Sequence, residues 1–177
     1  KMPETVTAVS LEARWQAIRQ QFPQFDAEID IAHRCGQALG AALSGQADPL
    51  QLLFPGGDLS STVKLYQESP FAKTYSGLVG QVVAEALAEL PVERPLRVLE
   101  IGGGTGGTSS YVLPQLPANR SRYVFTDMSP LFLDRARQKF TAYPFVDFRL
   151  LNIENDPVTQ GFAAAEKFDL IVAANVI

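Results

Sequence analysis

The sequence has one cysteine and one histidine among its 177 residues. So few of these residues exclude a disulfide framework and an ordinary metal site built from cysteine and histidine ligands. We interpret Cys35 as a small hydrophobic residue on a helix. We assign His33 no role as a catalytic base, because the sequence places no acid to orient its ring. No metal site is therefore expected.

Long apolar runs and an excess of positive charge are missing as well. No segment is long enough to span a membrane, no signal-peptide pattern opens the chain, and the net charge of −4 offers no basic surface for nucleic acid. With 46% hydrophobic residues, the composition is typical of a cytoplasmic domain with one sizeable core. We interpret the cations in the second half of the chain as a solvated helix face: Arg120, Arg122, Arg135, Arg137 and Lys139.

Glycine is concentrated in the run LEIGGGTGGTSS, from Leu99 to Ser110, after a short apolar stretch. Because Gly102, Gly104 and Gly106 lack Cβ atoms, this loop can press its backbone against a ligand, with the amides of a following helix facing it. Read with Gly107, the run fits the dinucleotide pattern G-x-G-x-x-G, and it equally fits the G-x-G-x-G of S-adenosylmethionine (SAM) sites. The glycines alone leave both cofactors open, together with a plain turn whose helix is capped by Thr108 or Ser109.

Two acidic residues favour SAM. Glu100 stands two residues before the first glycine, where we expect it to face the ligand, and a carboxylate suits a sulfonium and an ammonium better than a pyrophosphate. Asp127 ends the apolar segment Tyr123–Thr126, where an acid can accept both ribose hydroxyls. The alternative for Asp127 is a helix-capping role, because Ser129-Pro130 is typical of a cap and first turn.

Two further strands are expected over residues 145–151 and 168–173, which gives four strands of a parallel sheet. Ligands of such sheets bind outside the carboxyl ends of the strands. We therefore expect Met128 and Asn152-Ile153 near an adenine, and Asn175 near the transferred group. Each asparagine could instead be a plain turn residue.

The segment Pro91–Pro95 separates a helical first half, residues 1–90, from the half with the strands, residues 91–177. In the first half, apolar residues recur at helical spacing from Leu11 to Phe22 and from Ile29 to Leu43. This spacing predicts two amphipathic helices that pack together over a hydrophobic core. A third, long helix is expected over residues 72–90.

Five segments together resemble the C-methyltransferase domain of modular polyketide synthases: DPLQLLFPGG, LYQESPFAKTY, VLEIGGGTGGTSS, YVFTDMSP and FDLIVAANVI. The resemblance implies a class I SAM-dependent methyltransferase, an α/β fold with a helical lid followed by a Rossmann-like parallel sheet, of which this chain supplies about four of seven strands. It also implies a methyl transfer to the α-carbon of a β-ketoacyl thioester. That substrate is carried by the phosphopantetheine of an acyl carrier protein, beside the neighbouring synthase domains.

The resemblance also distributes roles among residues. It implies that SAM is held by the glycine loop, including Gly103, and by the acidic and strand-end residues named above, with Asn152 where relatives commonly have aspartate. It places a lid tyrosine near the methyl transfer, Tyr66 first and Tyr75 second; tyrosines buried within the lid are the alternative. We add Asn175 to the catalytic candidates. The deprotonating histidine of the family, helped by a later glutamate, is expected directly after Ile177.

Three functions stay open on these grounds. The first is the SAM-dependent C-methyltransferase domain. The second is a truncated, inactive pseudo-methyltransferase that serves the synthase as a structural domain, with this stretch alone expected to be inactive. The third is a nicotinamide-dependent oxidoreductase, which G-x-G-x-x-G permits and Glu100 argues against.

Overall fold

The computed structural model describes residues 10–58 and 60–176. The chain forms two compact units, residues 1–71 and 72–177. The division falls earlier than the predicted one at residue 90, because the long helix α5 (Pro70–Ala88) contributes Val79, Val83 and Leu87 to the core of the second unit.

The first unit is helical. It consists of α1 (Leu11–Gln21), η1 (Pro23–Phe25), α2 (Asp26–Leu43), α3 (Pro49–Leu53), η2 (Pro55–Gly57), α4 (Ser60–Val63) and the π-helical turn η3 (Lys64–Glu68). Ser10 caps α1 and Asp48 caps α3, each by accepting a backbone N–H at the start of its helix.

The two predicted amphipathic helices are present as α1 and α2, but the expected core between them is not. Ile29 is their buried hydrophobic residue among those described, whereas Leu39 and Leu43 are 55% and 81% exposed. The helices meet instead through a hydrogen bond from Arg19 to Asp30 of 2.9 Å and through the rings of Trp15 and His33, 4.8 Å apart. Cys35 is a free, half-buried thiol.

The second unit is built on the four parallel strands that the sequence predicts. They are β1 (Leu96–Ile101), β2 (Ser121–Asp127), β3 (Val146–Leu150) and β4 (Leu170–Ala173), in the order β3-β2-β1-β4. In the register, Glu100 of β1 pairs with Phe125 of β2 and Val172 of β4. All four strands end at one edge of the sheet, where a parallel α/β fold binds its ligand.

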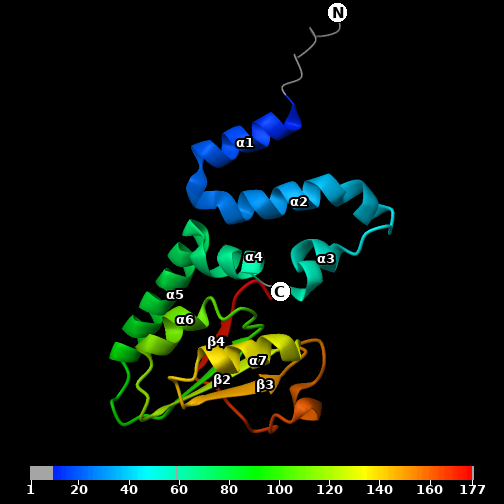
Figure 1. Ribbon diagram of the computed structural model, residues 1–177. Coiled ribbons are helices and arrows are strands. Elements are labelled where there is room, and N and C mark those ends of the chain that lie inside the picture. The colour runs from blue at the N-terminus through cyan, green and yellow to red at the C-terminus, as the bar shows by residue number, and fades with distance from the viewer. Residues whose placement is uncertain (1–9, 59, 177) are drawn as a thin grey trace, which may run out of the picture. The chain divides into compact units, whose positions relative to one another are not determined.

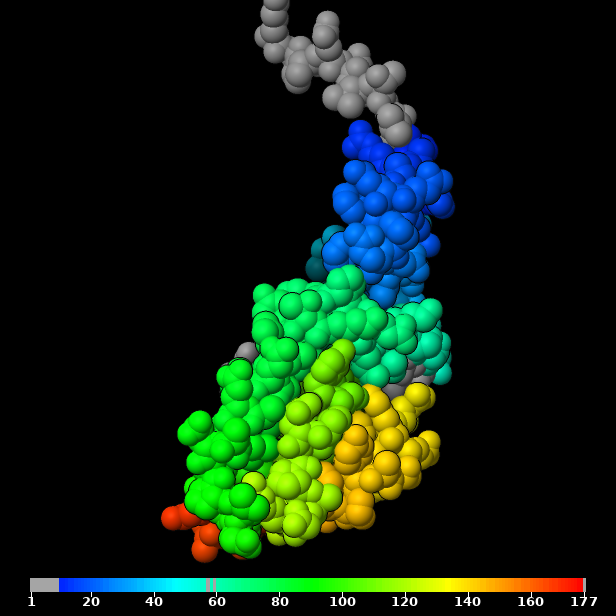
Figure 2. Space-filling model, turned by 90° about the vertical axis from the view of Figure 1, so that its left-hand side faces the viewer, coloured from blue at the N-terminus to red at the C-terminus, as the bar shows by residue number. Residues whose placement is uncertain are grey.

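Three helices cover one face of this sheet: α5, α6 (Ser109–Val112) and α7 (Pro130–Lys139), which lies over β2 and β3 (Figure 1). In Figure 2 the surfaces of the three helices lie side by side. Beneath them is the main core, formed by buried residues that include Val83, Val98, Val112, Tyr123, Phe125, Leu133 and Phe140. The other face has a smaller cluster of Leu99, Val124, Leu151 and Phe162.

The short turns η4 (Leu113–Gln115) and η5 (Pro157–Gln160) complete the unit. Ser129 occupies the cap position of α7 as predicted, but its side chain makes no capping hydrogen bond. The predicted solvated helix face is wrong in part, because Arg122 lies on β2 rather than on a helix. Lys139 is an exposed residue of α7 as predicted, but its ammonium also contacts the glycine loop.

A candidate cofactor site at the glycine loop

The glycine loop joins β1 to α6 at the carboxyl edge of the sheet, and its underside is pressed onto the core. A Cβ on Gly103 would overlap the ring of Phe125, so only glycine fits there. Gly104, in contrast, has φ +53°, and a Cβ on it would meet nothing nearer than the Gly102 carbonyl oxygen at 3.8 Å. Gly104 therefore presents an open face of backbone, the shape that a closely approaching ligand needs.

Asp127 ties this loop to the end of β2. Its Oδ2 accepts a hydrogen bond from the Gly104 N–H at 2.9 Å, and its Oδ1 accepts one from the Ser129 N–H at 2.8 Å. The residue is 6% exposed. A carboxylate has about four acceptor positions, so each oxygen keeps one for a further donor such as a ribose hydroxyl. Asp127 thus takes part in the turn before α7 and keeps the capacity to bind a ligand.

Glu100 lies beneath the loop and not toward the open face where the sequence places it. It is 2% exposed, and its Oε2 accepts hydrogen bonds from the hydroxyls of Ser109 and, at 2.8 Å, Tyr123. Burial raises the pKa of the Glu100 carboxyl, and burial beside Glu100 raises the pKa of Tyr123 well above its ordinary value. In this conformation Glu100 can attract a cationic ligand through its charge without touching it, and it can support the loop that would contact the ligand. A role as a cofactor ligand stays a prediction.

The buried carboxyl makes the stability of the chain depend on pH. Because its pKa is raised in the folded state, the unfolded chain releases this proton first as the pH rises above about 4.5, the ordinary value. Folding stability then falls through the window from that value up to the raised pKa. Glu100→Gln cannot ionise, so wild type should lose stability relative to this variant from pH 4.5 upward. Urea unfolding across pH 4 to 8 measures the difference, with the exposed Glu89→Gln as control. Parallel curves for wild type and Glu100→Gln would contradict this assignment.

The end of β3 lies beside Asp127, whose carbonyl accepts the Leu151 N–H at 3.1 Å. Met128 is 71% exposed and Ile153 46% exposed, so both offer apolar surface at this edge. The Asn152 Oδ1 accepts the Glu154 N–H at 2.9 Å, an Asx turn of the kind given as its alternative role. Sequence reasoning missed Gln160, whose side chain donates to the Asn152 carbonyl and accepts from its N–H. Contact of these residues with an adenine stays a prediction.

The segment after β4 turns back toward the glycine loop. Asn175 has a left-handed backbone, with φ 56°, which asparagine tolerates better than most residues. A Cβ on Gly102 would lie 2.6 Å from Val176. Asn175 is therefore one residue from a contact with the loop, and its position near a cofactor stays a prediction.

The two candidate tyrosines lie in different compact units. Tyr66 is part of η3 in the first unit and is 46% exposed, whereas Tyr75 is on α5 in the second unit and is 57% exposed. Neither is a buried tyrosine. Their catalytic roles stay predictions.

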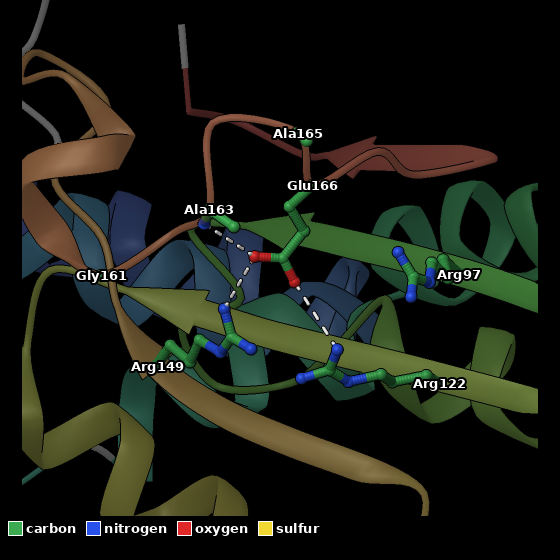
Figure 3. A pocket seen from close by; sticks show the side chains of 7 residues that line it. All are labelled: Arg97, Arg122, Arg149, Gly161, Ala163, Ala165 and Glu166. Carbon is green, nitrogen blue, oxygen red and sulfur yellow. Dashed lines mark hydrogen bonds and ion pairs between the residues drawn. The ribbon is translucent and has the colours of Figure 1, made fainter.

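A hollow lies on the sheet face away from α5, α6 and α7, and Figure 3 shows the residues that line it. Glu166 is at its centre. Its carboxylate pairs with Arg149 at 3.2 Å and with Arg122 at 3.6 Å. This acid neutralises much of the arginine charge, and the hollow contains none of the predicted site residues.

Two expected absences concern the described part of the chain. No three histidine, cysteine, aspartate or glutamate residues within 10–58 and 60–176 come together as a metal site would require. Over the same ranges, no helix combines the length and the apolar character needed to cross a membrane.

Comparison with known proteins identifies the family of the chain. A model of the methyltransferase domain family matches residues 99–177, from the glycine loop to the last strand. The chain is 35% identical over 167 residues to the non-reducing polyketide synthase ausA of Emericella nidulans, and 33% identical over 176 residues to the synthase adrD of Penicillium roqueforti. The matches cover 92% and 97% of this chain but only 7% of each synthase.

Solved structures give the same result at the level of the domain. The CurJ carbon methyltransferase is 42% identical with a TM-score of 0.87, covering 95% of this chain and 44% of that one. The CMeT domain of the citrinin polyketide synthase is 31% identical with a TM-score of 0.77, covering 86% and 42%. The trans-methyltransferase CalH, solved with S-adenosylhomocysteine (SAH), is 31% identical with a TM-score of 0.65, covering 92% and 44%. The fold is thus that of a class I methyltransferase, and the chain belongs to the C-methyltransferase domains of polyketide synthases.

Proposed function

We propose that this chain binds SAM at the glycine loop and supplies the cofactor-binding part of a synthase domain that methylates the α-carbon of a β-ketoacyl thioester. The observation that carries the proposal is the link between the open Gly104 backbone and Asp127 at the ends of β1 and β2. The SAH complex of the similar protein CalH supports the choice of cofactor.

The chemistry assigns separate tasks. SAM supplies an electrophilic methyl group on a sulfonium and leaves as SAH. The α-carbon must lose its proton to a base, and its electron pair then forms the new bond to the methyl carbon. Among the residues of this chain we propose holding roles: the glycine loop for the methionine part, Asp127 for the ribose, and Met128, Asn152 and Ile153 for the adenine. Tyr66, Tyr75 and Asn175 are proposed near the transferred methyl group.

We further propose that the thioester is presented by the phosphopantetheine arm of an acyl carrier protein, in company with the other domains of a cytoplasmic synthase. The relatives are multidomain synthases of which this chain spans a small share, so the assay uses the whole synthase that carries it. Incubation with a β-ketoacyl carrier protein and SAM should add one methyl carbon to the acyl chain, detected by mass spectrometry of the released arm. An unmethylated chain from a synthase that binds SAM would favour the structural, inactive alternative.

The open face of Gly104 gives a variant that tests cofactor binding directly. Gly104→Val would project a branched side chain into the proposed ligand space and hold it at positive φ, so we expect SAH affinity to fall by at least about tenfold. Gly45→Val is the matched control, because Gly45 also has positive φ, +72°, and open surroundings but lies in the first unit. Calorimetry with SAH compares the two variants. Equal losses in both would mean that backbone strain, and not a blocked site, explains the effect.

A further inference from the structure

The glycine loop rests on the end of α7 as well as on the sheet. The Phe140 ring, directly after α7, would lie 2.8 Å from a Cβ on Gly106. Phe140 is 4% exposed, and its ring centroid is 6.2 Å from that of Phe125, which lies under Gly103. Two aromatic rings therefore form a floor under the loop.

Lys139, the last residue of α7, reaches the same loop with its ammonium. Its Nζ donates to the Gly106 carbonyl at 3.1 Å and to the Thr105 carbonyl at 3.3 Å, and it lies 5.2 Å from the centroid of the Phe140 ring. The Gly106 carbonyl also accepts the Ser110 hydroxyl at 2.7 Å. Two successive loop carbonyls are thus held by one cation.

Holding a carbonyl also fixes the amide that follows it. A trans peptide is planar, and its N–H points opposite to its C=O. With the Gly106 carbonyl turned toward Lys139, the N–H of the next residue, Gly107, points away from α7. The two hydrogen bonds from the Lys139 ammonium to the Thr105 and Gly106 carbonyls, called the clamp below, therefore determine which side of the loop presents carbonyls and which presents N–H donors. An anionic or polar cofactor group needs N–H donors.

The charge of Lys139 is attracted by that of a buried acid. Glu100 of β1 is the charged group that acts on the ammonium, and the attraction is mutual: Lys139 lowers the pKa of Glu100, while Glu100 raises that of Lys139. Partial loss of hydration outweighs this attraction and leaves the pKa of Lys139 below its ordinary 10.5. Lys139 and the buried Glu100 are thus coupled electrostatically, while the direct contacts of the ammonium are with the Thr105 and Gly106 carbonyls.

We infer that Lys139 is a positioning residue of the cofactor loop, whose ammonium holds the Thr105 and Gly106 carbonyls so that the loop keeps the shape that binds SAM. This inference rests on the proposed function. It assigns a specific task to a residue outside the glycine motif, on a helix that the motif does not include.

Three variants test the clamp by calorimetry with SAH. Lys139→Met keeps an unbranched side chain one atom shorter and removes its charge, Lys139→Arg restores a cation, and Arg135→Met removes a charge from an exposed position of the same helix. We expect Lys139→Met to weaken SAH binding about five- to tenfold, the scale of one typical intramolecular hydrogen bond. Lys139→Arg should stay within about twofold of wild type, as should Arg135→Met.

A pH series separates positioning from a merely structural effect. The affinity of wild type for SAH should fall as the pH rises through the pKa of Lys139, whereas a guanidinium stays charged and Lys139→Arg should hold its affinity. SAH titrates equally in both titrations, so the difference belongs to the side chain. A Lys139→Met variant that binds SAH like wild type, or identical alkaline profiles for wild type and Lys139→Arg, would overturn the clamp.

Hydrogen exchange of the ligand-free chain gives a readout that does not need the cofactor. The Gly106 and Ser110 amides, which donate to the Gly103 and Gly106 carbonyls, should exchange faster in Lys139→Met and unchanged in Arg135→Met. Unchanged exchange in Lys139→Met would also overturn the clamp. If wild type binds no SAH while its loop exchange responds to Lys139→Met, the clamp on the loop stands and the proposed function fails.

Discussion

Replacing Asp127 with alanine should weaken SAH binding by about a hundredfold, the largest effect we expect of a single site residue. The variant loses two things at once. It removes the acceptors proposed for the ribose hydroxyls, and it frees the Gly104 N–H that the carboxylate holds at 2.9 Å. Calorimetry with SAH measures the loss. Asp134→Ala, which removes an exposed acid from α7, is the control for net charge.

Asp127→Asn refines this prediction. Both carboxylate oxygens accept backbone N–H groups, from Gly104 and from Ser129. An asparagine amide has one oxygen, so its NH₂ group would face one of those two donors. We therefore expect Asp127→Asn to bind SAH nearly as weakly as the alanine variant, although it is close in size to aspartate. Full binding by Asp127→Asn would contradict the role of the hydrogen bond between Asp127 and the Gly104 N–H.

Phe125→Ala should lower the free energy of unfolding by about 3–5 kcal/mol, the range for removing a large aromatic ring from a core. Phe125 has no exposed surface, and its ring centroid lies 5.8 Å from that of Phe148 and 6.2 Å from that of Phe140. A loss of this size is a large part of the stability of an ordinary domain. Urea unfolding measures it, with Phe71→Ala, 63% exposed, as control. A loss below about 1 kcal/mol would mean that this part of the core is less closely packed than described.

The same ring also links stability to the site. Because Gly103 lies against Phe125, the cavity left by alanine would open directly under the glycine loop. Phe125→Leu fills part of that cavity, so it should recover more SAH affinity than Phe125→Ala at a temperature where both variants are folded. Equal SAH affinity in the two variants would mean that packing at Phe125 does not affect the loop, and that Phe125 contributes to stability alone.

The parts of this site that could be predicted from the sequence depend on local rules. The pattern consists of glycines at fixed spacing after one apolar strand and an acid at the end of the next. It predicts a ligand site at one edge of the sheet, because parallel strands end together there. The four strands were found because buried strands read as short apolar runs. These features need no knowledge of which side chains meet across the fold.

The orientation of Glu100 needed that knowledge. Its carboxylate is held by the hydroxyls of Ser109 and Tyr123, nine and 23 residues away. The sequence suggests for Ser109 only a helix cap. Strand alternation holds a usable signal, since Glu100 shares its face of β1 with the buried Val98.

The contacts of Lys139 and the packing of the first unit could not be predicted, for the same kind of reason. A lysine among arginines is most often solvated, and nothing local shows that its ammonium reaches carbonyls more than thirty residues back along the chain. The stripes of α1 and α2 have the spacing of a core face, yet periodicity identifies an apolar face without saying what covers it. In both cases the partner lies outside the pattern.

The most direct test of the account is a calorimetric titration of the 177-residue chain with SAM, SAH and NADH. We expect saturable one-to-one binding of SAM and SAH and no heat from NADH beyond dilution. The open glycine loop is paired with acids, and the Lys139 ammonium that reaches it is engaged by the Thr105 and Gly106 carbonyls. Binding of NADH, or a folded chain that binds neither SAM nor SAH, would contradict the assignment of this loop as a SAM site.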